Sequence, residues 1–162
     1  MDVLPGLDPA LTIVAVFGNT VPNVILAIAA TIMPRGVRVI RSATIAIREM
    51  DYATAARSIG ASDLRIMLRH VMPNTVAPFL IIMSSMFGTA ILTEAGLSFL
   101  GLGIAEPTPS WGRMLTGQAA QYMVTAPWIL IFPGLAITIT VLGFAFAGDA
   151  LRDIFDPKLR GR

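Results

Sequence analysis

Few side chains in this sequence have types and spacings that could perform chemistry. The chain has no cysteine, which excludes disulfides, thiolate metal sites and a cysteine nucleophile. Its one histidine, His70, follows Arg69 without a second ligand nearby, so we interpret it as a solvated or docking residue. Gly101-Leu102-Gly103 lacks the Lys-Ser/Thr of a phosphate-binding loop. No catalytic triad or carboxylate pair is visible, so we expect no catalytic residue, no metal site and no cofactor bound by the chain, which is not expected to be an enzyme.

Two residues remain as candidates for a role in passage of a solute or in docking of a partner. Glu94 interrupts an apolar run, and a carboxylate within a membrane is by default a functional candidate. It lies 20 residues after Asn74, about 30 Å along a helix, so a solvated position at a membrane surface is the alternative. Trp111 lies in a proline-rich loop and could face a partner protein or anchor the loop at the interface.

The elements that position these residues are membrane helices. Of the 162 residues, 55% are hydrophobic and only 14% are charged, against about a quarter charged in soluble domains. Three stretches without charge each exceed the roughly 20 residues that a helix needs to cross a bilayer. They lie between Asp8 and Arg35, between His70 and Glu94, and between Arg113 and Asp149. The sequence therefore predicts an all-α, polytopic membrane protein, and its net charge of +2 gives no reason to expect nucleic acid as a partner.

The apolar and polar stretches divide the chain into segments. Residues 10–33 form apolar helical segments that are interrupted by Gly18-Asn19-Thr20, so we expect a short piece, Leu11–Phe17, before a helix over 21–33. The later segments are a polar segment at 35–74, a transmembrane helix at 75–95, a loop at 101–126, a transmembrane helix at 127–148 and a polar tail at 149–162.

The basic residues predict the orientation of these segments. Seven arginines lie in segment 35–74 and four basic residues in the tail, whereas the 101–126 loop holds only Arg113. By the positive-inside rule, the polar segment and the tail face the cytoplasm and the loop is extracytoplasmic. The predicted location is thus the cytoplasmic membrane, with several spans.

The polar segment 35–74 reads as two helices joined by a glycine corner. Gly60 can adopt the left-handed conformation that ends one helix, Ser62 or Asp63 can cap the next, and Pro73 is expected to close it. Apolar residues follow helical spacing on both sides of the corner, at positions 52, 55, 56 and 59 and at positions 64, 67, 68 and 71. A basic linker on anionic lipid is one interpretation. The fixed corner favours the other, a docking element for a cytoplasmic partner.

The corner resembles the EAA loop of ABC importer permeases. Residues 53–62, Ala-Thr-Ala-Ala-Arg-Ser-Ile-Gly-Ala-Ser, with Met72-Pro73-Asn74 downstream, match its pattern, and Thr54 stands where that family has a glutamate. The resemblance implies a coupling helix over about 62–71 that inserts into an ATPase subunit. It also implies the coupling residues, which are Tyr52, Thr54, Ala55, Ala56, Gly60, Ser62, Leu64, Leu68 and Pro73.

Two further stretches are similar to the dipeptide/oligopeptide/nickel group of these permeases. They are Ser98-Phe99-Leu100-Gly101-Leu102-Gly103 with Pro107-Thr108-Pro109-Ser110-Trp111-Gly112, and the ending Gly148-Asp149-Ala150-Leu151-Arg152-Asp153. The resemblance covers roughly residues 35–160 and implies part of a type I ABC importer permease fold with a cytoplasmic helix–turn–helix coupling loop. Family members begin with an earlier pair of helices, so we expect this chain to be a C-terminal portion.

The implied function is the permease component of an ATP-driven importer of peptides or a related small solute. The implied partners are ATPase subunits that bind ATP and magnesium, a second permease subunit, an extracytoplasmic substrate-binding protein and membrane lipid. The alternative is a small membrane scaffold or a permease fragment without transport activity. A membrane enzyme is disfavoured because the spans offer no catalytic cluster.

Overall fold

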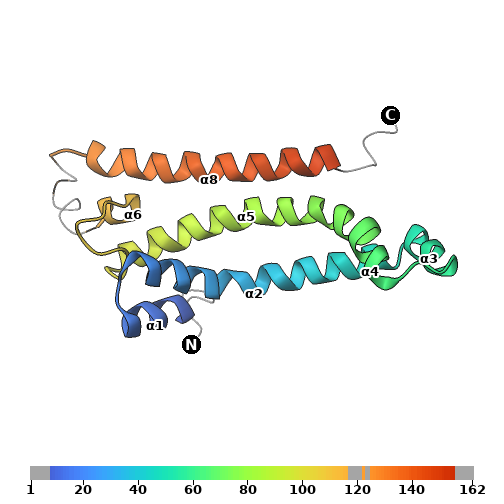
Figure 1. Cartoon of the computed structure of the whole chain (residues 1–162). Coiled ribbons are helices and arrows are strands. Elements are labelled where there is room, and N and C mark those ends of the chain that lie inside the picture. Colours follow the sequence, from blue (N-terminus) through green and yellow to red (C-terminus); the bar gives the residue numbers. More distant parts are fainter. Residues whose placement is uncertain (1–7, 117–121, 123–124, 156–162) are drawn as a thin grey trace. The chain divides into compact units, whose positions relative to one another are not determined.

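The computed structural model of the chain describes residues 8–116, 122 and 125–155. Every regular element within these ranges is a helix, which confirms the all-α fold (Figure 1). In chain order the helices are α1 (Asp8–Phe17), α2 (Val21–Arg48), α3 (Asp51–Ser58), α4 (Asp63–Ile66), the π-helix η1 (Met67–Val71), α5 (Met72–Phe99), α6 (Trp111–Met114) and α8 (Trp128–Phe155).

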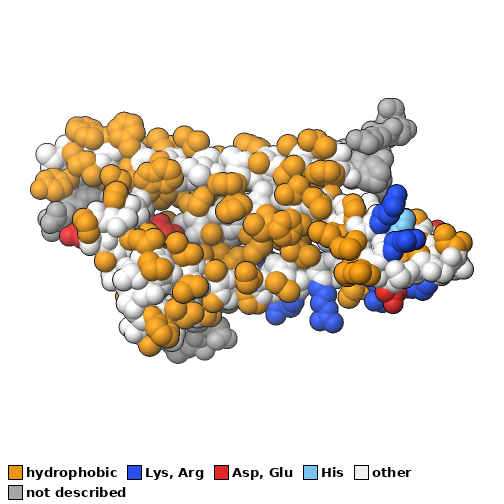
Figure 2. All heavy atoms as spheres, in the orientation of Figure 1, with side chains coloured by type: hydrophobic (Ala, Val, Ile, Leu, Met, Phe, Trp, Pro, Cys, Tyr) orange, Lys and Arg blue, Asp and Glu red, His pale blue; other side chains and the backbone are white. Residues whose placement is uncertain are grey.

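Three helical stretches in the described part of the chain are long and apolar enough to cross a membrane. They are Val21–Arg48, Asp63–Phe99 and Trp128–Phe155. At most 17% of the apolar window of each is buried, so most of their hydrophobic side chains are partly or fully exposed, and Figure 2 shows hydrophobic side chains spread over the visible face. Exposed apolar surface of this extent is typical of helices that face lipid. The prediction of a polytopic helical membrane protein is thus confirmed.

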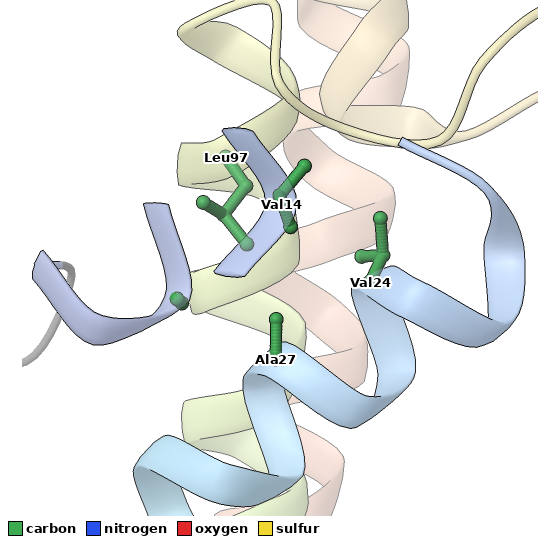
Figure 3. Close-up of a cluster of buried hydrophobic side chains, with 5 residues drawn as sticks. Val14, Val24, Ala27 and Leu97 are labelled. Atoms are coloured by element: carbon green, nitrogen blue, oxygen red, sulfur yellow. The ribbon is translucent and has the colours of Figure 1, made fainter. Parts of the chain in front are cut away.

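The chain forms two compact units, and each of α2, α5 and α8 contributes to both. The first unit comprises residues 1–34 and 86–144, and the second comprises residues 35–85 and 145–162. The core of the first unit joins α1, α2 and the end of α5. Its fully buried members are Ala10, Val14, Val24, Ala27 and Leu97. Figure 3 shows Val14, Val24, Ala27 and Leu97 pointing toward one another from the three helices.

A tight turn brings α1 onto α2 in the first unit, as the sequence predicts. Gly18 has a positive φ of 86°, and its N–H donates to the Val14 carbonyl at 2.9 Å. The Asn23 side chain donates to the carbonyls of Phe17 and Gly18, at 2.6 and 3.2 Å. These bonds satisfy carbonyl groups that the end of α1 would otherwise leave without donors.

Small residues bring α5 and α8 together within each unit. In the first unit, a Cβ added at Gly88 would lie 3.6 Å from Val141 Cγ1, and the rings of Phe87 and Phe144 are stacked with centroids 5.2 Å apart. In the second unit, a Cβ at Gly148 would lie 2.5 Å from Ser84 Oγ. Membrane helices pack closely where such small residues let the backbones approach.

The predicted end of the first long helix at Met33 is wrong, because α2 continues through Pro34 to Arg48. Proline weakens a helix interior by removing one hydrogen bond and crowding a carbonyl, typically by about 3 kcal/mol. Beyond Pro34, Gly36 and Ile47 are buried three helical turns apart, on one face of α2. Packing of that face in the second unit offsets the local cost.

The prediction that Pro73 closes a helix is also wrong. Asp63–Phe99 is one continuous helical stretch, and Pro73 is the second residue of α5. The π-helix η1 immediately precedes the proline, and there the Met72 N–H donates to the Met67 carbonyl, five residues back. This wider turn changes the hydrogen-bond pattern just before the proline, so the chain continues without a break.

The last span is longer than the predicted 127–148. α8 continues to Phe155 because the residues after Gly148 keep helical spacing, and the first proline comes only at position 157. The end of the predicted tail, residues 156–162, lies outside the described residues, as do residues 117–121 and 123–124 of the predicted loop.

Candidate functional site

The glycine corner predicted from the sequence is present in the second unit, between α3 and α4 (Figure 1). Gly60 has a positive φ of 84°, which confirms the predicted left-handed conformation. Its N–H donates to the Arg57 carbonyl at 3.0 Å, and the Ala61 N–H donates to the Ala56 carbonyl at 3.1 Å. This pair of bonds is a Schellman motif. A Cβ at Gly60 would meet nothing within 4 Å, so the backbone conformation, not space, requires glycine here.

The corner is held by a small apolar core. Ala53 and Ala56 of α3 are buried with Ile66 of α4, Val71 of η1 and Ile47 of α2, and the Ala61 side chain packs against them. The two alanines allow α3 to lie close to the following helix. The orientation of α3 relative to α4 and η1 is therefore fixed by packing on one side and by the Gly60 turn at the end.

The corner also carries large apolar side chains that are exposed in the described part of the chain. The exposed fractions are 86% for Ile59, 61% for Leu64 and 53% for Leu68. Met67 and Tyr52 are also exposed, at 50% and 37%. We call these five residues the corner ridge. Such side chains are normally buried in a soluble helix pair, so the corner ridge is a surface suited to a protein partner.

The structure places the remaining predicted coupling residues around this surface. Ala55 and Thr54 are exposed, and the Thr54 hydroxyl donates to the Asp51 carbonyl at 2.8 Å. Ser62 is the N-cap of α4, although its side chain makes no capping hydrogen bond. Ala56 is buried in the core of the corner and Pro73 is exposed in α5, so Ala56 supports the corner without being available for contact. Their role in coupling stays a prediction.

His70 also lies at the corner, next to Tyr52. The centroids of the two rings are 6.4 Å apart and the rings are tilted. No group of three or more histidine and carboxylate residues in the described ranges could hold a metal ion.

The second candidate region is the loop after α5, in the first unit. Gly101 ends α5 with a positive φ of 80°. The Leu102 N–H donates to the Leu97 carbonyl at 2.9 Å and the Gly101 N–H to the Ser98 carbonyl at 3.0 Å, a second Schellman motif. Leu102 packs against the core that contains Leu97, the apolar contact that commonly accompanies this motif.

A chain of polar contacts fixes the loop on α5. The Ser98 hydroxyl donates to Glu94 Oε1 at 2.7 Å, so its own proton is used and the Ser110 hydroxyl, 3.4 Å away, is the donor to Ser98. Ser110 in turn accepts from the Arg113 N–H at 3.2 Å as the N-cap of α6. Ser98 is only 3% exposed. The predicted candidate Glu94 is thus the acceptor at the end of a largely buried hydrogen-bond chain.

The Arg113 side chain holds an earlier part of the same loop. Its guanidinium donates to the Ile104 carbonyl at 3.1 Å and forms an ion pair with Glu106. Trp111, the other candidate in this region, is 46% exposed at the start of α6 and makes no hydrogen bond within the described residues. The structure therefore brings Glu94 and Arg113 into one polar assembly and leaves the Trp111 ring available.

The parts that Ser98, Ser110 and Arg113 play in this assembly were not predicted from the sequence. The four-residue spacing places Ser98 on the same helical face as Glu94, so this contact could have been predicted from the sequence. The contact of Ser98 with Ser110 could not, since it depends on how the loop returns to α5.

Comparisons with known proteins agree with these features. Residues 3–161 match the family described as binding-protein-dependent transport system inner membrane component. The chain is 46% identical over 157 residues to the glutathione transport system permease proteins GsiD of Escherichia coli (strain UTI89) and of Shigella sonnei. The alignment covers 97% of this chain and 52% of each relative, so the chain spans about half the length of these curated relatives. This chain belongs to the family of binding-protein-dependent transport system inner membrane components.

Proposed function

We propose that the chain acts as a permease component of an ATP-driven importer that moves short peptides or a related small solute across the cytoplasmic membrane. Its partners are ATPase subunits, which bind ATP and magnesium, a second permease subunit and an extracytoplasmic substrate-binding protein. Membership of the family and the similarity to permeases named for glutathione, itself a tripeptide, support this proposal.

The observation that carries the proposal is the corner ridge. It presents exposed apolar side chains on a corner whose geometry is fixed by the Gly60 turn and by the packed alanines of α3. A rigid apolar edge can transmit motion from a partner, because a push on it displaces the whole corner rather than bending a loose loop. Since η1 and α5 follow α4 without a break, movement of the corner reaches the α5 span directly.

The basic residues support a cytoplasmic position for the corner. The segment 35–74 and the tail after Asp149 hold eleven of the twelve Lys and Arg residues, and the loop after α5 holds Arg113. With α2, α5 and α8 each crossing once, the corner and the end of α8 face the same side. An ATPase in the cytoplasm would then meet the corner ridge.

Co-purification with an ATPase subunit tests this function. Leu68→Ser removes an apolar side chain from the corner ridge that is 53% exposed, and Leu100→Ser removes an equally exposed one from the turn directly after α5. We expect Leu68→Ser, alone or with Leu64→Ser, to lose most of the bound ATPase subunit and Leu100→Ser to retain it. Equal retention by both variants would show that the corner ridge is not the ATPase-binding surface.

A further inference from the structure

The C-terminal half of α2 carries basic side chains that the described chain does not neutralise. Arg35, Arg38 and Arg41 are all exposed, whereas Gly36 and Ile47 on another face of the same helix are buried. Within the described ranges the one ion pair joins Arg113 to Glu106, far along the sequence from these arginines. Figure 2 shows Lys and Arg side chains projecting outward along this part of α2. Arg48, the last residue of α2, is also exposed, so four arginines of this helix have no acidic partner within the described residues, and Arg35, Arg38 and Arg41 are the three nearest the uncharged stretch.

The length of α2 places these arginines at the membrane interface. The helix begins at Val21, and residues 21–34 carry no charge. Fourteen residues rise about 21 Å, which is less than the roughly 30 Å of bilayer hydrocarbon. With Val21 taken as the start of the span, α2 crosses the hydrocarbon only if the span includes part of the arginine-containing stretch. Counted from Val21, Arg35 lies about 21 Å along the helix, Arg38 about 26 Å and Arg41 about 30 Å.

Arginines at this depth extend their charged ends toward the lipid phosphates while their aliphatic stems stay in the hydrocarbon. The side chains between them suit such a position, because Val37 and Val39 are 56% and 45% exposed. A guanidinium group binds a phosphate with two parallel hydrogen bonds, and it gains further from the low dielectric constant near the hydrocarbon.

We propose that Arg35, Arg38 and Arg41 form a binding site for anionic phospholipid headgroups, such as phosphatidylglycerol, in the leaflet at the C-terminal end of α2. The arginines of the corner, Arg57, Arg65 and Arg69, are also exposed but lie in the sequence beyond the end of α2. They do not belong to the site. The site binds lipid selectively by charge, and it sets how far α2 extends into that leaflet.

Lipid selectivity measured by electron spin resonance tests the proposal. The chain is reconstituted in phosphatidylcholine bilayers with trace spin-labelled phosphatidylglycerol or spin-labelled phosphatidylcholine, and the motionally restricted fraction of each is compared. We expect the wild-type chain to prefer phosphatidylglycerol by roughly fivefold or more, since one basic residue near the surface contributes about 1 kcal/mol. The ratio of the restricted fraction of phosphatidylglycerol to that of phosphatidylcholine should fall close to one in Arg35→Gln/Arg38→Gln/Arg41→Gln. In the wild-type chain this ratio should decrease in high salt.

Two variants control this experiment. Arg57→Gln/Arg65→Gln/Arg69→Gln removes the same charge from the corner and should keep the preference, as should Arg35→Lys/Arg38→Lys/Arg41→Lys, which keeps the charge on α2. A wild-type chain that shows no preference for phosphatidylglycerol at low salt would by itself overturn the proposal. The three arginines would then be better explained as partners for acidic groups of another protein. Equal loss in the two glutamine variants would also overturn it, because net charge rather than this site would then explain the selectivity.

Discussion

Gly112 lies against Ala95 so closely that a Cβ on the glycine would stand 2.6 Å from the Ala95 Cα. The same Cβ would be 2.9 Å from Ser98 Cβ, and a Cβ on Gly103 would be 2.5 Å from Ser98 Cα. Because these neighbours are largely backbone atoms of α5, no rotation of a side chain relieves such contacts. The two glycines therefore let the loop after α5 return onto that helix, where Ser110 reaches Ser98.

Gly112→Ala should displace α6 from α5. Overpacking of this kind typically destabilises a protein by about 1–3 kcal/mol. We expect a lower thermal midpoint in detergent and faster proteolysis within the loop. Gly96→Ala is the matched control, because a Cβ at Gly96 in α5 meets nothing within 4 Å and alanine is the better helix former. Equal stability of the two variants would show that the close contact is relieved at little cost.

The hydrogen-bond chain that ends on Glu94 predicts different effects for two substitutions of that residue. Glu94→Gln keeps an oxygen that can accept from Ser98, so we expect the thermal midpoint to change little. Glu94→Ala leaves the Ser98 hydroxyl, in a residue 3% exposed, without that acceptor. The expected loss is about 1–3 kcal/mol, measured as the free energy of unfolding.

The same pair of variants separates a structural role of Glu94 from a role in solute passage. Transport is measured with a labelled peptide in cells that carry the matching importer subunits. If the negative charge takes part in passage, Glu94→Gln folds normally but transports poorly. Normal transport by Glu94→Gln would restrict Glu94 to holding the loop.

Local rules predicted the backbone of this protein only where no distant packing competes. The left-handed Gly60 and the turn at Gly18 could be predicted because each depends on a few neighbouring residues. The helix ends predicted at Met33 and Pro73 were wrong, since α2 continues through Pro34 to Ile47, which packs in the corner core, and the π turn at η1 leads into Pro73 without a break.

The candidate site was likewise predicted only in part. The helical spacing of apolar residues indicated an exposed edge at the corner, and Ile59, Leu64 and Leu68 are exposed there. It did not show that Ala56 and Val71 are buried in the core of the corner, because their burial depends on how α3 packs against α4 and η1. Sequence periodicity alone cannot distinguish the two apolar faces of such a short helix pair.

Replacing Gly60 should uncouple transport from ATP hydrolysis while leaving insertion into the membrane intact. Space is free around Gly60, so only its positive φ resists a side chain. A β-branched residue is strongly disfavoured in that region, whereas asparagine is tolerated. We expect Gly60→Val to lose most transport and Gly60→Asn to retain most of it, with both variants present at normal levels in the membrane. Normal transport by Gly60→Val would mean that the corner can change shape without consequence.

Labelling of introduced cysteines should show the corner and the loop after α5 on opposite sides of the membrane. The chain has no native cysteine, so each introduced thiol reports one position. Ser62→Cys suits the corner because the Ser62 side chain makes no capping hydrogen bond. Thr108→Cys suits the loop better than a change at Ser110, which caps α6.

The expected pattern follows from the charge distribution and the three spans. An impermeant maleimide added to intact cells should label Thr108→Cys and not Ser62→Cys, and opening the cells should make Ser62→Cys reactive. Ala150→Cys, exposed near the end of α8, should behave like Ser62→Cys because α5 and α8 together return the chain to the same side. Labelling of Ser62→Cys in intact cells would place the corner ridge outside, where no ATPase could reach it. Opposite behaviour of Ala150→Cys and Ser62→Cys would instead mean that α5 or α8 does not cross.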